Sequence, residues 1–256
     1  MLRSMGSAAA VLVAAVLPVS AQWLKIPAPN VPKGPDGKPI LSAPAPRRAD
    51  GKPDLSGVWN PNPKYLVNFA ADLKPEEVPM QPWALALYNE RKEGKHSKEE
   101  PDANCLPQGV PKIDTAPAPY KFLQLPGLIV ILYEAFSQFR QIFMDGRELP
   151  KDPNPTWLGY SVGKWDGDTL VVDSAGYNGK AWLDQQGHPL TDALHVTERF
   201  RRRDVGHMDL EVTIDDPKAY TRPWTAKENL TLMPEGELLE FVCQENEKDV
   251  RHILDQ

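Results

Sequence analysis

The chain has 256 residues, a formal net charge of −6 and 41% hydrophobic residues, so it is long and apolar enough for a domain with a sizeable core. Its acidic balance lacks the electrostatic footprint of a nucleic-acid-binding protein, and we expect no nucleic-acid partner.

The N-terminal residues are typical of a secretory signal peptide. Arg3 provides the positive charge, residues 8–19 form a short apolar run, and residues 19–21 (Val-Ser-Ala) fit a small-residue cleavage site. The run is shorter than a comfortable bilayer-spanning helix. We therefore expect residues 1–21 to be removed and the protein to be exported, to the periplasm or the extracellular medium, without stable membrane insertion.

Residues 22–53 are rich in proline and are predicted to form an extended arm or linker. Residues 54–256 are predicted to form a single domain. Within it, residues 73–93 are predicted to be a helical insert, because Pro82 suits a first-turn position and Gly94 suits a helix stop.

The remainder of the chain alternates strand-like runs with turn signals. Its centre is residues 158–174, in which Asp166-Gly167 predicts a two-residue type I′ hairpin turn. No run between the strands suits a crossover helix, and a closed barrel hides every strand edge. We therefore predict an all-β fold, an antiparallel up-and-down barrel with a proline-rich N-terminal arm and one helix. The other predicted strands are 122–136, 139–144, 193–202, 208–214, 225–233 and 238–244.

Strand alternation places four charged residues on otherwise apolar faces: Glu198, Glu228, Arg140 and Glu134. A buried carboxylate needs a partner, so these groups together predict a polar patch inside a largely apolar cavity, which is the composition of a small-molecule site. Glu198 and Glu228 with Arg140 are the candidate catalytic residues, since paired carboxylates can act as acid and base. The alternative is that these charges lie at strand ends and reach solvent.

Aromatic residues in the hairpin and in two long loops are the candidate ligand contacts. Loops of this length often form lids or binding segments, and packed structural turns are the alternative. With Glu134, the predicted ligand-binding residues are Tyr160, Trp165, Trp182, Tyr220 and Trp224.

Two further motifs resemble catalytic or metal sites. Residues 159–163 match G-x-S-x-G, but a strand and a hairpin follow where a nucleophile elbow requires a helix, so no serine nucleophile is predicted. His188, Asp192 and His195 have the residue types of a two-His, one-carboxylate metal site. Nothing in the sequence sets their geometry, and a solvated polar loop is the alternative, so we assign no metal and no cofactor.

The two cysteines, Cys105 and Cys243, are predicted to form a disulfide, because exported proteins fold in an oxidising compartment. Two unpaired thiols are the alternative. The oligomeric state stays open.

Three runs, SVGKWDGDTLVVDS, TDALHVTERFRR and DDPKAYTRPW, resemble a family of exported bacterial proteins of unassigned function. That resemblance covers residues 54–244 and implies export and a β-rich fold. Gly57-Val58-Trp59 and the strand meander are similar to lipocalin-like barrels, in which the tryptophan closes one end of the barrel.

These features predict an exported barrel whose partner is a small, partly apolar molecule. Two alternatives stay open. One is a cofactor-independent hydrolase, isomerase or lyase that uses carboxylates in the same cavity, and the other is a structural or interaction module.

Overall fold

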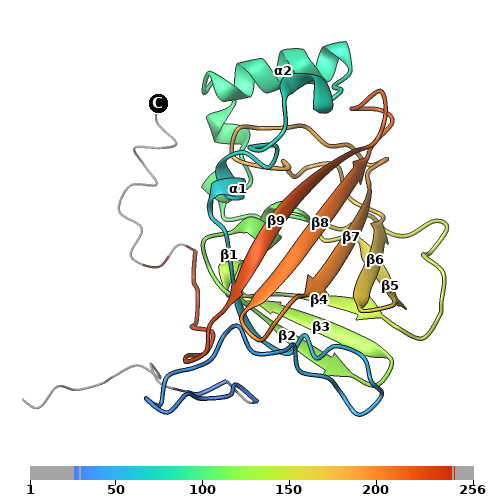
Figure 1. Cartoon of the computed structure of the whole chain (residues 1–256). Coiled ribbons are helices and arrows are strands. Elements are labelled where there is room, and N and C mark those ends of the chain that lie inside the picture. The colour runs from blue at the N-terminus through green and yellow to red at the C-terminus, as the bar shows by residue number, and fades with distance from the viewer. Residues whose placement is uncertain (1–25, 29, 244, 246–256) are drawn as a thin grey trace, which may run out of the picture.

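A computed structural model describes residues 26–28, 30–243 and 245, and the strands within them form a closed barrel (Figure 1). The predicted signal peptide lies outside the described residues. The strands are β1 (Gly57–Pro61), β2 (Tyr120–Leu125), β3 (Leu128–Tyr133), β4 (Gln138–Phe143), β5 (Tyr160–Asp166), β6 (Thr169–Ala175), β7 (His195–Arg202), β8 (His207–Asp215) and β9 (Trp224–Leu232).

The all-β barrel is confirmed, and its strands follow one another around the barrel in chain order, with β9 pairing with β1 to close it. One neighbouring pair differs from the prediction, because β4 and β5 are parallel. Only Ile142 with Ser161 and Phe143 with Val162 pair in this seam. The long segment 144–159 returns the chain to the start of β5 without a helix, and its prolines favour irregular structure.

Helices cover one end of the barrel and fill part of its opening. The prediction of a single helix was incomplete, because α1 (Lys64–Val67) precedes α2 (Pro82–Lys92), and α2 lies beyond one end of the barrel (Figure 1). Among the described residues, no helix combines the length and apolar character needed to cross a membrane. Short 3-10 helices are η1 (Pro75–Glu77), η2 (Ser97–Glu99), η3 (Asp102–Asn104), η4 (Lys112–Thr115) and η5 (Ala135–Ser137).

Two local predictions about strands were wrong. In the β5–β6 hairpin Asp166 pairs with Thr169, so the loop is Gly167-Asp168, one residue later than predicted. Only Gly167 of this pair has a positive φ, of 59°, which is the pattern of a type II′ turn. Residues 238–243 form no strand, since the pairing of β9 with β1 already closes the barrel and leaves no free edge there.

The end of the barrel where β7 stops and β1 begins is closed by a tryptophan and an arginine. Trp59 is fully buried, and its indole Nε1 donates to the carbonyl oxygen of Leu55 at 3.0 Å. The guanidinium of Arg202 lies 4.9 Å from the ring centroid of Trp59 and donates to the carbonyl oxygen of Val205. Arg202 shares the inner face of β7 with Glu198. Strand alternation therefore places a second cation, besides Arg140, on an inner face.

The proline-rich arm packs against the barrel and does not extend into solvent. Pro44 forms an isolated bridge with Asp204, and the amide of Gly206 donates to the carbonyl oxygen of Leu41 at 2.8 Å. Arg47 forms a salt bridge with Asp168 at 2.6 Å, at the tip of the β5–β6 hairpin. Residues 30–53 therefore cover the loops at this end.

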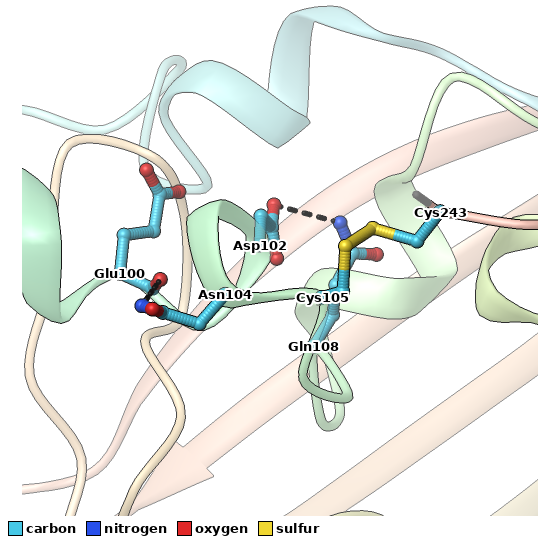
Figure 2. The surroundings of a disulfide bond; sticks show 6 residues. All are labelled: Glu100, Asp102, Asn104, Cys105, Gln108 and Cys243. Carbon is cyan, nitrogen blue, oxygen red and sulfur yellow. Dashed lines mark hydrogen bonds between the residues drawn. A yellow bond between two sulfur atoms is a disulfide. The ribbon is translucent and has the colours of Figure 1, made fainter. Parts of the chain in front are cut away.

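The predicted disulfide is present between Cys105 and Cys243, with Cα atoms 5.7 Å apart (Figure 2). Cys105 follows η3, and Cys243 belongs to the C-terminal segment rather than to a strand. The side-chain amide of Gln108 donates to Asp102 at 2.9 Å beside the bond. The disulfide therefore ties the segment after β9 to the turn that precedes η4.

Candidate functional site

A buried ion pair lies inside the barrel between β4 and β7. Arg140 of β4 and Glu198 of β7 form a two-pronged pair, with Nη1 of Arg140 3.0 Å from Oε1 of Glu198 and Nη2 bonded to Oε2. Two further guanidinium hydrogens go to the hydroxyls of Ser161, at 2.9 Å from Nε, and Ser174, at 2.8 Å from Nη2. All four side chains are buried, so a single cation links β4, β5, β6 and β7.

A second acidic residue reaches this cluster from a loop. Asp114 lies in η4, which is buried within the barrel opening. Its Oδ1 accepts a hydrogen bond from the hydroxyl of Tyr133 at 2.6 Å, and its Oδ2 lies 3.8 Å from Nη1 of Arg140. Burial first, and then the charge of Glu198, raises the pKa of Asp114 to about 7.

Sequence patterns did not identify Asp114, because it follows no strand alternation. The only local signal was the pair of apolar residues Val110 and Ile113 beside it, both of which are buried. The neighbouring Lys112 is also fully buried and bridges Glu100 at 2.8 Å and Asp102 at 3.0 Å.

Glu228 faces the interior from β9, as predicted, but it does not join the ion pair. Among the described residues, neither carboxyl oxygen of Glu228 has a hydrogen-bond partner. Burial, followed by the charges of Asp114 and Glu198, holds the pKa of Glu228 well above its usual range. Glu228 therefore favours its neutral form, and Arg140 and Glu198 form the charge-balanced pair of the interior.

A cavity of about 450 Å³ opens at the seam where β4 and β5 separate. Arg140 lines it together with the aromatic side chains of Phe139, Phe143 and Tyr160. Gln138 and Thr156 also line it, and each has a buried side-chain oxygen, Oε1 of Gln138 and Oγ1 of Thr156, without a hydrogen-bond partner among the described residues. An apolar cavity with a few polar groups left free is the composition of a small-molecule site. The remaining lining residues are Pro107, Ser137, Gln141, Trp157, Leu158 and Gly159.

Of the predicted ligand contacts, Tyr160 alone lines this cavity. Trp165 lies in a separate surface groove near Arg48. Three others are buried away from this cavity. Trp182 lies beneath the guanidinium of Arg91 at 4.2 Å, and Tyr220 packs against Trp224 with ring centroids 5.5 Å apart.

The prediction that Glu134 faces the interior was wrong. The inner face of β3 is formed by Ile129, Ile131 and Tyr133, and the strand ends before Glu134. Its Oε2 instead accepts a hydrogen bond from the amide of Leu239 at 2.8 Å. β3 is apolar on both faces, so alternation could not tell the inner face from the outer one.

The three residues considered as a metal site, and the serine of the G-x-S-x-G match, each bind protein side chains instead. His188 pairs with Asp184, Asp192 forms a salt bridge with Lys218 at 2.7 Å, and His195 lies 3.9 Å from Asp173. Within the described ranges, no cluster of three or more His, Cys, Asp or Glu side chains is arranged to hold a metal. Ser161 lies within β5 and is bonded to Arg140, as described above.

Comparison with known proteins adds no assignment: no family model, no curated protein and no solved structure matches the chain significantly.

Proposed function

We propose that the protein is exported and binds a small, partly apolar molecule in the cavity between β4 and β5. The observation that carries this proposal is the combination of aromatic walls with two buried polar atoms that have no partner, on Gln138 and Thr156. A buried polar group without a hydrogen-bond partner costs about 1–3 kcal/mol of stability. A ligand that supplies the missing hydrogen bonds removes this cost and therefore gains affinity.

The ion pair behind the cavity supports the same function. Arg140 lines the cavity, but its guanidinium is committed to Glu198 and to two serines. It therefore acts as a rigid support for β4 rather than as an anion ligand. The expected ligand has an apolar ring system and a hydroxyl or amide that pairs with Gln138 Oε1, which can only accept a hydrogen bond.

The test uses two isosteric substitutions in the cavity wall. 2-Naphthol, an apolar ring system with one hydroxyl, serves as the probe, and its affinity is measured by titration calorimetry. The double variant Gln138→Leu/Thr156→Val should bind at least about tenfold more weakly, the equivalent of one lost net hydrogen bond. Its thermal midpoint should not fall, because the removed atoms have no partners in the free protein.

Thr197→Val is the matched control, since Thr197 donates to Asp173 at 2.8 Å away from the cavity and should leave the affinity unchanged. Equal binding by the parent and the double variant would contradict the site. Mass spectrometry of molecules that co-purify from the native host then identifies the natural ligand.

The export half of the proposal is supported by the disulfide, which oxidising compartments favour. N-terminal sequencing of the protein secreted by its native host should begin near Gln22. A mature protein that retains Met1 would refute export by a cleaved signal peptide.

A second candidate function is a cofactor-independent hydrolase, isomerase or lyase. One observation favours it: the pKa of Asp114 is raised to about 7, close to the optimum for a general acid or base. The full burial of Asp114 and Glu198 disfavours it, because a substrate cannot reach them in this conformation. Asp114→Asn should abolish turnover of a substrate and leave its affinity intact, whereas a ligand that returns chemically unchanged from the parent protein supports binding alone.

A further inference from the structure

An aspartate–histidine pair lies outside the barrel interior, in the loop between β6 and β7. Oδ2 of Asp184 lies 2.5 Å from Nδ1 of His188, and both side chains are buried. Asp184 also accepts hydrogen bonds from the backbone amides of Phe69 at 2.8 Å and Gly187 at 2.9 Å. Because the carboxylate of Asp184 can only accept hydrogen bonds, the ring nitrogen that faces it, Nδ1 of His188, carries the hydrogen.

In the neutral ring the second nitrogen of His188 is therefore an acceptor. Nε2 makes no hydrogen bond to any described residue. The ring is held in place by stacking on Tyr88 of α2, with centroids 4.2 Å apart and planes at 27°. This histidine is thus oriented by its carboxylate, and its free nitrogen can accept a hydrogen bond from a ligand.

His188 lines a cavity of about 540 Å³ between α2 and the segment before it. The apolar part of its wall is formed by side chains such as Leu73, Val78, Met80 and Leu85. Among the residues that line it, Lys74 and Lys92 are positively charged and none is acidic. The cavity combines an apolar body, an imidazole acceptor and a positive rim.

We propose that this cavity is a second ligand site, which takes a small hydroxylated organic acid. Its hydroxyl donates to Nε2 of His188, its ring or chain packs on the apolar wall, and its acid group lies toward Lys74 and Lys92. This inference is independent of the cavity between β4 and β5, which has no lysine or histidine in its wall.

Three related probes separate the two polar contacts. 4-Hydroxybenzoate carries both groups, benzoate lacks the hydroxyl, and phenol lacks the acid. In the parent protein 4-hydroxybenzoate should bind about tenfold more tightly than either of the other two, because each missing group forfeits one polar contact.

Variants then assign each preference to a side chain. His188→Phe keeps the stack on Tyr88 and should remove the preference for 4-hydroxybenzoate over benzoate. Lys74→Gln/Lys92→Gln should remove the preference for 4-hydroxybenzoate over phenol, and Lys52→Gln on the arm is the control that changes surface charge without lining the cavity.

The lysine variants keep the test decisive if His188→Phe folds poorly, since Lys74 and Lys92 lie on the rim and are exposed. The double variant Gln138→Leu/Thr156→Val should keep the preference for 4-hydroxybenzoate over benzoate and phenol, which distinguishes failure of this site from failure of the first. Equal affinity for the three probes, or preferences that survive the variants, would overturn the assignment.

Discussion

Replacing Arg140 with methionine removes the cation at the centre of the barrel and keeps much of its apolar length. The change leaves Glu198 fully buried without its counter-ion, and it removes the donors to Ser161 and Ser174. The two serine hydroxyls lie 2.9 Å apart and can still bond to each other. Glu198 therefore accounts for most of the loss.

The expected loss of stability is about 3–5 kcal/mol, the usual cost of removing one partner from a buried ion pair. For a domain of this size it corresponds to a fall in the thermal midpoint of about 6–20 °C.

Thermal melts and urea titrations of Arg140→Met at pH 8 measure this effect. Arg147→Met is the matched control, since Arg147 pairs with Asp145 on the exposed surface, where an ion pair contributes about 0–1 kcal/mol. The double variant Arg140→Met/Glu198→Gln should recover part of the stability. If Arg140→Met has the same thermal midpoint as the parent at pH 8, the stabilising role of the buried ion pair is refuted.

Three other predictions follow from the buried groups and the disulfide. Glu228→Met should stabilise the fold by about 1–3 kcal/mol in urea titrations at pH 8, since it removes a buried acid without partners; a loss of stability would reveal a partner that the structure lacks. The pKa of Asp114 rises from its ordinary 3.8 to about 7, so the folded state binds the extra proton and its stability falls as the pH rises from 4 to 7, by on the order of 4 kcal/mol. Asp114→Asn should flatten that part of the pH profile, and identical profiles would exclude Asp114 as the titrating group. Reduction of the bond between Cys105 and Cys243 should cost up to about 5 kcal/mol by the loop-entropy estimate for its sequence separation of 138, and an unchanged urea midpoint under reducing agent would contradict a stabilising role.

The sequence by itself determined the fold class and the inner faces of the later strands. In β7 and β9 the residues two positions before and after each glutamate are apolar, so the period of two placed Glu198 and Glu228 on the buried face. The same rule placed Arg140 inside β4. It failed for Glu134, because β3 is apolar on both faces and carries no alternation to follow.

Only the tertiary structure decided which of these groups meet. Alternation assigns a residue to a face but does not say which residue lies across the barrel, and that depends on strand register and on loops. Register and the closure of the barrel bring Arg140 to Glu198 and leave Glu228 without a partner. Asp114 arrives on η4, a loop element that no periodicity marks.

The two candidate cavities also depend on tertiary contacts. The first exists because β4 and β5 run parallel and pair through only two residues each, so the sheet opens beside Arg140. The second needs α2 to pack against the loop that carries His188, through the stack with Tyr88. Both arise where segments distant in sequence pack side by side, and strand periodicity describes only the residues within one segment.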